Sequence, residues 1–208
     1  MIQRPSKIVC VGRNYAEHAA ELGNEMPERP LLFFKPPSSL IDPGGQIRLP
    51  NASQRVEHEG EIGVVLGTAL RNGAWGDALA SIAGITCVND VTARDLQRTD
   101  GQWARAKGFD TFCPAGPRAV PLDELPPLEE LEVICRVNGE QRQHGHARHM
   151  AFDIPTILSY ISGIMTLEPG DLVATGTPAG VGPLEPGDVV EVEIPGVGVL
   201  SNPVVAEN

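Results

Sequence analysis

Three glutamates at every second position lead into an apolar segment of this chain. Residues 56–67 read VEHEGEIGVVLG, with the acids at Glu57, Glu59 and Glu61. Because side chains in a β-strand alternate between faces, all three carboxylates would lie on one face. Like charges roughly 6 to 7 Å apart repel in a low-dielectric site, and Mg²⁺ or Mn²⁺, which takes carboxylate oxygens, would relieve that repulsion. The alternative is an exposed strand face on which water solvates the charges.

A further acid, Asp90, ends another apolar segment, ITCVND at residues 85–90. An acid that closes a buried strand at the rim of a sheet is well placed to bind a metal ion. The alternative for Asp90 is an N-cap of a helix in the following VTARDLQ. The first segment continues as IGVVLG, which is too apolar on both faces for a solvated edge. The residues alone therefore support a Glu-Glu-Asp oxygen site as a hypothesis.

His18 and Glu21 have the residue types of a general base and of the carboxylate that would orient it. His18 and Glu21 are three residues apart in an expected helix over 14–23, so their side chains would share a face. A carboxylate that holds one imidazole nitrogen leaves the other as a base near neutral pH. A surface histidine is the alternative, and a surface charge is the alternative for Lys107 in AKGFD.

A histidine cluster, HGHARH, contains His144, His146 and His149. Its spacing of two and three could suit a transition metal. The cluster follows an Asn138-Gly139 turn in a polar stretch, so we expect it to form a solvated loop.

Short apolar segments between frequent Gly and Pro turns indicate a mainly β, mixed α+β domain with a few short helices. Strands are expected at 7–11, 29–37, 46–50, 56–67, 85–91 and 131–140. Asp77 is the candidate N-cap of a helix over 76–84, and Asp153 caps a helix over 153–163 with Gly163 following its end. The repeated LEPGD segments at 167–171 and 184–188 predict Pro-Gly turns.

The composition excludes several classes of protein. The formal net charge of −11 gives no support to nucleic-acid or membrane-surface binding. The four cysteines form no Cys-x-x-Cys pair, which argues against a zinc ribbon and a disulfide framework. Without a long apolar segment, we expect a cytoplasmic protein, and without a linker we expect one domain over residues 1–208.

Several motifs together resemble the fumarylacetoacetate hydrolase family, most closely its small acylpyruvase-like members. They are CVGRNYAEHAAELG, FFKPPSSL, VEHEGEIGVVLG, NDVTARDLQ, WARAKGFDTFCPAGP, VNGEQRQ and LVATGTPAGVGPL, from about residue 7 to 194. The resemblance implies the family's mixed β-roll, usually as a homodimer. It also implies metal-dependent cleavage of a carbon–carbon bond in a 3-acylpyruvate or similar 2,4-dioxo acid.

The resemblance also implies roles for individual residues. One Mg²⁺ or Mn²⁺ would be held by Glu59, Glu61 and Asp90, with Glu57 as a neighbour. His18 and Glu21 would activate water, Lys107 would stabilise a pyruvate enolate, and residues 13–26 would form a lid over the 2-oxo-acid substrate. Substrate contacts would come from Arg94, Gln97 and Thr177.

Alternatives stay open for several site residues, for the substrate and for the reaction. A local ion pair with Asp95 is the alternative for Arg94, and the glycines of GTPAGVG would let backbone amides approach an anionic substrate. The segment 98–102 looks shorter than in some relatives, which leaves the substrate's size open. Decarboxylation or tautomerisation of oxaloacetate, isomerisation or decarboxylation of a hydroxymuconate-type diacid, and a non-catalytic metal-stabilised binding module are the alternative functions.

Overall fold

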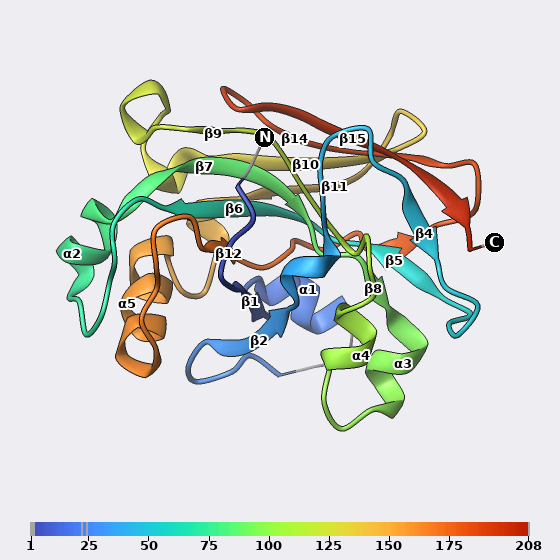
Figure 1. The fold of residues 1–208 in the computed structure, drawn as a ribbon, viewed down its shortest axis with the longest axis horizontal. Coiled ribbons are helices and arrows are strands. Elements are labelled where there is room, and N and C mark those ends of the chain that lie inside the picture. The colour runs from blue at the N-terminus through green and yellow to red at the C-terminus, as the bar shows by residue number, and fades with distance from the viewer. Residues whose placement is uncertain (1–2, 22, 24, 208) are drawn as a thin grey trace.

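Strands from the apolar segments assemble into three sheets in a computed structural model that describes residues 3–21, 23 and 25–207 (Figure 1). The seven-stranded sheet has the order β2-β1-β12-β6-β7-β9-β3. Its strands are β1 (Ile8–Gly12), β2 (Leu31–Lys35), β3 (Leu40–Ile41), β6 (Gly60–Leu66), β7 (Ile82–Asn89), β9 (Cys113–Val120) and β12 (Leu172–Ala174). Its central pairs, β12 with β6, β6 with β7 and β7 with β9, are antiparallel, and β1 pairs with β12 in parallel.

The second sheet covers one face of the first. It has the order β11-β10-β14-β15-β4. Its strands are β4 (Ile47–Leu49), β10 (Glu132–Val137), β11 (Glu140–His146), β14 (Val189–Ile194) and β15 (Gly198–Ala206). Buried side chains such as Ile62 of β6 and Val192 of β14 share one hydrophobic core. Gly60 allows the close approach of the sheets, since a Cβ there would lie 2.9 Å from the Cβ of Cys135.

A small third sheet divides the acidic segment. It has the order β13-β5-β8, with β5 (Val56–His58), β8 (Thr92–Ala93) and β13 (Gly182–Pro183). Residues 56–66 therefore form two strands, β5 and β6, with Glu59 between them, and the expected single strand over 56–67 is wrong. Pairing with different neighbours on either side of Glu59 causes this break.

Short helices lie at the margins of the sheets (Figure 1). They are α1 (Ala16–Glu21), α2 (Trp75–Ala80), α3 (Arg94–Thr99), α4 (Ala104–Lys107) and α5 (Ile154–Ile164). Single 3₁₀ turns occur at Pro37–Ser39, Leu122–Glu124, Leu128–Glu130 and Ala147–His149. The mainly β, mixed fold expected from the sequence is confirmed.

The helix boundaries test the capping predictions. Asp153 caps α5 as expected, because its Oδ1 accepts a 2.8 Å hydrogen bond from the Thr156 amide. Asp77 is not the N-cap of α2, since the helix begins at Trp75 and the Asp77 carboxylate accepts a hydrogen bond from the Ala74 amide instead. Gly163 does not follow the end of α5, which continues to Ile164.

The turns follow the sequence prediction. Asn138 and Gly139 both have positive φ, +53° and +79°, as a tight hairpin between β10 and β11 requires. Gly170 and Gly187 of the LEPGD segments also have positive φ, +84° and +99°. The expectation of a loop for the histidine cluster is wrong for His144 and His146, which lie on β11.

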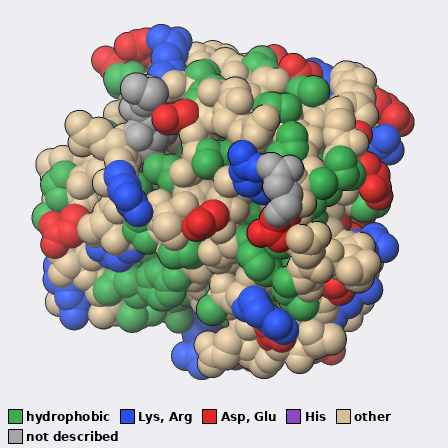
Figure 2. All heavy atoms as spheres, turned by 45° about the vertical axis from the view of Figure 1, so that its right-hand side comes forward, with side chains coloured by type: hydrophobic (Ala, Val, Ile, Leu, Met, Phe, Trp, Pro, Cys, Tyr) green, Lys and Arg blue, Asp and Glu red, His purple; other side chains and the backbone are tan. Residues whose placement is uncertain are grey.

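Two features of the structure concern binding to nucleic acids and membranes: the distribution of surface charge and the character of the helices. On the face drawn in Figure 2, Lys and Arg side chains lie scattered among Asp and Glu side chains. No helix in the described part of the chain has the length and apolar character needed to span a membrane.

Candidate active site

A cavity with a volume of about 270 Å³ lies where the ends of several strands and helices meet. Eight of the nine predicted site residues line it, and the ninth, Glu21, contacts one of the eight. The fold therefore brings together residues that are up to 159 positions apart in the sequence (18 to 177). A cavity of this volume suits a small ligand, because pockets for drug-sized molecules begin at roughly 300 Å³.

The predicted metal ligands converge at one end of the β6–β7 pair. Glu61 lies in β6 opposite Val88, and Asp90 directly follows β7, so the antiparallel pairing carries both acids to the same edge. A 2.8 Å hydrogen bond from the Asp90 amide to the Glu59 carbonyl holds the two segments together. Carboxylate oxygens of Glu59, Glu61 and Asp90 all lie within 4.8 Å of one another, and all three residues are buried.

Buried cations compensate two of these three acids. The Lys107 ammonium lies 2.8 Å from Oε2 of Glu59 and 2.5 Å from Oδ2 of Asp90. Lys35 donates to Oδ1 of Asp90 at 2.6 Å, and Arg94 contacts Oε1 of Glu59. Burial opposes ionisation of Glu59, but the charges of Lys107 and Arg94 outweigh it and hold its pKa well below the usual range.

The third acid has less compensation. Among described residues, the Glu61 carboxylate accepts one hydrogen bond, from the Gly176 amide at 2.8 Å. Burial raises its pKa well above the ordinary value, and the charges of Asp90 and Glu59 add to the effect. An added cation would relieve this repulsion. Three buried carboxylates offer only hard oxygen donors, the set that suits Mg²⁺ or Mn²⁺, so the residues fit a divalent ion.

Glu57, the neighbour of the expected ligands, binds two arginines. Its Oε2 accepts from Nε of Arg94 at 2.6 Å, and its Oε1 accepts from Nε of Arg55 at 2.5 Å. Arg94 therefore bridges Glu57 and Glu59. The alternative of a local pair between Arg94 and Asp95 is wrong, because the Asp95 carboxylate accepts from Ser53 and Gln54 instead.

The neighbouring acids keep the two cations of the site, Lys107 and Arg94, in their charged form. Burial alone would lower the pKa of Lys107, but the charges of Asp90 and Glu59 raise it above the ordinary value. Burial likewise would lower the pKa of Arg94, but the charges of Glu59 and Glu57 raise it above the ordinary value. Both side chains therefore remain cationic at neutral pH, beside the acids and facing the cavity.

His18 and Glu21 form the expected pair on α1. Nδ1 of His18 lies 3.3 Å from Oε2 of Glu21, and the His18 side chain is buried against the cavity. Glu21 also accepts from the Gly180 amide at 3.1 Å, so α1 is tied to the loop after β12. Residues 22 and 24 of the expected lid over 13–26 lie outside the described residues, and the lid stays a prediction.

The Gly-rich loop after β12 differs from its predicted role. The amides of Gly176 and Gly180 donate to the protein's own carboxylates, Glu61 and Glu21, and so are not available to an anionic substrate. Gly180 has a φ of +101°, and a Cβ there would lie 2.0 Å from the Arg142 carbonyl oxygen. The loop therefore positions acids of the site through its backbone.

Thr177 is held by a residue that the sequence analysis did not single out. Its Oγ1 donates to the Gly60 carbonyl at 2.9 Å and accepts from Nε2 of Gln143 at 2.7 Å. Oε1 of Gln143 accepts from the Gly60 amide at 2.9 Å. Gln143 is the last residue of VNGEQRQ, one of the motifs behind the family resemblance, but its position on a polar strand does not by itself predict this role.

Other residues in and around the cavity were also missed. Lys35 supports Asp90, and its position at the end of an apolar strand before two prolines was an available signal. Arg13 and Arg98 line the cavity, as do Phe33 and Trp103, whose rings meet edge to face with centroids 5.3 Å apart. Arg98 belongs to the segment 98–102, which therefore borders the cavity.

Comparisons with known proteins show which family the chain belongs to. Residues 7–205 match the family described as fumarylacetoacetate (FAA) hydrolase, C-terminal. The mitochondrial oxaloacetate decarboxylase of Dictyostelium discoideum is 46% identical over 182 residues, 85% of this chain and 83% of that protein. The mitochondrial oxaloacetate tautomerase of Homo sapiens is 41% identical over 213 residues, 98% of this chain and 68% of that protein.

A solved structure has the same fold. The crystal structure of 5-carboxymethyl-2-hydroxymuconate delta-isomerase from Mycobacterium smegmatis matches with a TM-score of 0.90 and 44% identity, covering 99% of this chain and 80% of that one.

Proposed function

The chain belongs to the fumarylacetoacetate hydrolase family, and from that premise we propose a divalent-metal-dependent enzyme that forms the enolate of a small 2-oxo acid. The reaction that we propose first is hydrolysis of a carbon–carbon bond in a 3-acylpyruvate or related 2,4-dioxo acid. The observation that carries this proposal is the His18–Glu21 pair, in which the buried His18 borders the same small cavity as three acids and Lys107, and the exposed Glu21 holds its ring from behind.

Glu59, Glu61 and Asp90 would hold one Mg²⁺ or Mn²⁺ ion. When bound, the ion supplies Lewis-acid polarisation of the oxygens of a 2-oxo acid. Arg94 favours the ionised form of Glu59, and Lys35 fixes the Asp90 carboxylate in position, so both acids are oriented by partners outside the ligand set.

His18 serves as the general base. Glu21 holds Nδ1, which leaves Nε2 to accept a proton from water. The resulting hydroxide adds to the acyl carbonyl carbon distal to the 2-oxo acid. The bond between that carbon and C3 then breaks, and its electron pair goes to C3 and forms the pyruvate enolate. Protonation at C3 yields pyruvate, and the acyl group leaves as a carboxylate.

Lys107 stabilises the enolate. Its ammonium stays charged because Asp90 and Glu59 raise its pKa against the effect of burial, and it faces the cavity. A fixed positive charge aimed at an oxygen that becomes negative lowers the barrier more in a buried site than in water. Arg94, Gln97 and Thr177, which also line the cavity, would contact the substrate.

A second candidate is decarboxylation or tautomerisation of oxaloacetate, which passes through the same enolate. Arg13 and Arg98 favour it, because both line the cavity and neither forms an ion pair with a described residue. Two uncompensated guanidinium groups suit a substrate with a second carboxylate. The names of two relatives, an oxaloacetate decarboxylase and an oxaloacetate tautomerase, support the same candidate.

Product analysis on acetylpyruvate and oxaloacetate, each with Mg²⁺ and with EDTA, tests both candidates. Metal-dependent release of pyruvate and acetate would support the hydrolase. Carbon dioxide release or accelerated keto–enol exchange of oxaloacetate, with acetylpyruvate untouched, would support the second candidate. If neither compound reacts, neither is the substrate, and the result favours a bulkier diacid or a non-catalytic binding module.

A further inference from the structure

A second group of metal-binding side chains lies on β11, the edge strand of the five-stranded sheet, and on its neighbour β10. We propose that Glu132, His144 and His146 bind one Zn²⁺ ion. Each of these three residues offers one ligand atom, and the three atoms lie within 4.8 Å of one another. This group shares no residue with the cavity of the proposed active site.

The strand register places the three side chains together. His144 and His146 are two residues apart on β11, so they project from the same face of the strand. Glu132 of β10 is the direct partner of His146 in the antiparallel pair. Cross-strand partners have Cβ atoms roughly 5 Å apart, which brings the carboxylate within reach of both rings.

The distances are close to those of a formed site. Nε2 of His144 lies 2.8 Å from Oε2 of Glu132, and Nδ1 of His146 lies 3.8 Å from Oε1. Two ligand atoms on one tetrahedral Zn²⁺ at about 2.0–2.1 Å from the ion are separated by about 3.3 Å. Because the three ligand atoms already lie within 4.8 Å of one another, side-chain rotations alone would accommodate the ion.

The chemistry of the group favours zinc over the ion of the proposed active site. Two imidazoles and one carboxylate are a set that Zn²⁺ uses with an open fourth position, whereas Mg²⁺ prefers oxygen donors. The side chains are 41%, 37% and 23% exposed for His144, Glu132 and His146, so water has access to that fourth position.

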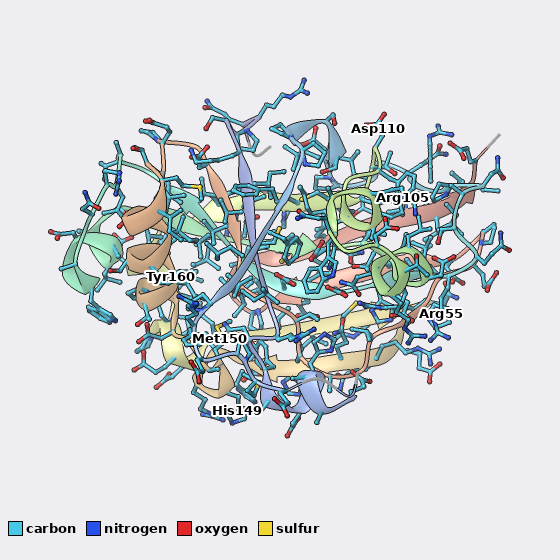
Figure 3. All side chains as sticks on the ribbon, turned by 90° about the horizontal axis from the view of Figure 1, so that it is seen from below. Arg55, Arg105, Asp110, His149, Met150 and Tyr160 are labelled. Carbon is cyan, nitrogen blue, oxygen red and sulfur yellow. The ribbon has the colours of Figure 1, made fainter. Side chains whose placement is uncertain are left out.

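His149 serves as a matched control. It lies in the 3₁₀ turn after β11, and Figure 3 places it at the rim of the molecule. Its ring centroid is 5.5 Å from that of His146, yet His149 does not belong to the group of ligand atoms within 4.8 Å. The proposal therefore assigns no ligand role to it.

The opposite face of β11 faces the proposed active site. Gln143, whose side chain alternates in direction with those of the two histidines, binds Thr177 and Gly60. An ion on the outer face would tie β11 to β10 and stabilise the native state by mass action.

The test is calorimetric titration of Zn²⁺ into protein without a histidine tag, in excess Mg²⁺ to compete for the all-oxygen site. We expect one Zn²⁺ per chain at the nitrogen-containing site and a higher thermal unfolding temperature. His144→Asn and His146→Asn should each weaken this binding at least tenfold, and His149→Asn should change it by less than threefold. With Cu²⁺ as the probe, electron paramagnetic resonance should show nitrogen coupling that is reduced in the first two variants.

Three results would overturn the proposal. They are an absence of Zn²⁺ binding in excess Mg²⁺, wild-type affinity in both His144→Asn and His146→Asn, and an equal loss in His149→Asn. Because the replaced rings lie at the surface, circular dichroism and unfolding without metal should match the wild type. The Zn²⁺ result does not depend on the proposed enzymatic function.

Discussion

Replacement of Glu61 by glutamine should make the metal-free protein more stable while it abolishes the response to metal. Glu61 is buried, and its carboxylate lies within 4.8 Å of those of Glu59 and Asp90. At an effective dielectric constant of about 20, each such like-charge pair costs about 3 kcal/mol. Attraction to Lys107 offsets about one of the two pairs. The amide carbonyl of the new side chain would keep the hydrogen bond from Gly176, so we expect a gain on the order of 1–3 kcal/mol at about pH 7.5.

The effect should depend on pH with a defined sign. Burial and then Asp90 and Glu59 raise the pKa of Glu61 in the folded state above its ordinary value of 4.5. A group with a raised folded pKa binds its proton more tightly when folded, so its contribution to stability is lost as pH rises from 4.5 through the folded pKa. The stability difference between Glu61→Gln and the wild type should therefore be small near pH 4.5 and widen as pH increases.

Urea unfolding in EDTA measures the free energy of unfolding of both proteins, and repetition with Mn²⁺ measures the metal response. At 100 times its dissociation constant, Mn²⁺ should stabilise the wild type by about 2.7 kcal/mol and Glu61→Gln not at all. Glu57→Gln is the matched control: it removes the charged partner of Arg94 and Arg55, so it should destabilise by about 1–3 kcal/mol. A Glu61→Gln protein that is less stable than the wild type in EDTA, or that Mn²⁺ stabilises equally, would refute this reasoning.

Three further substitutions test other parts of the site. His18→Asn should bind Mn²⁺ like the wild type but lose about 10²- to 10⁴-fold in turnover, and undiminished turnover would remove His18 from catalysis. Lys35→Met leaves Asp90 with one fewer buried partner and should cost about 3–5 kcal/mol in urea unfolding, whereas a loss below about 1 kcal/mol would contradict the assigned ion pair. Gly180→Ala places a Cβ against the Arg142 carbonyl at a positive φ and should lower turnover at least tenfold without loss of Mn²⁺ binding; normal turnover would show that the loop is not needed.

The sequence predicted local features well. Alternation along an expected strand singled out three glutamates, and an acid at the end of another strand added Asp90. The family resemblance then selected Glu59, Glu61 and Asp90, and the structure brings these three together. The Asn138-Gly139 turn formed because both residues tolerate positive φ. The cap at Asp153 depends on a bond to a residue three positions away, which is why local reasoning was enough.

Features set by distant pairing could not be predicted in this way. The break at Glu59 arises because β5 and β6 pair with different sheets, and no residue between them signals it. Lys35 meets Asp90 from 55 residues away, across two strands that are not neighbours in the sheet. β11 is a polar edge strand, and its sequence does not alternate between apolar and polar residues. The segment that holds His144 and His146 was therefore predicted as a loop.

The most direct test of the central proposal is exchange of the C3 protons of pyruvate in D₂O, followed by proton NMR with Mg²⁺ and with EDTA. Exchange reports formation of the enolate itself, whichever reaction follows. We predict exchange faster than in buffer, dependent on both enzyme and Mg²⁺, and lost in EDTA. Exchange at the buffer rate in the presence of Mg²⁺, or at the same enhanced rate in EDTA, would contradict a metal-dependent enolate at this site.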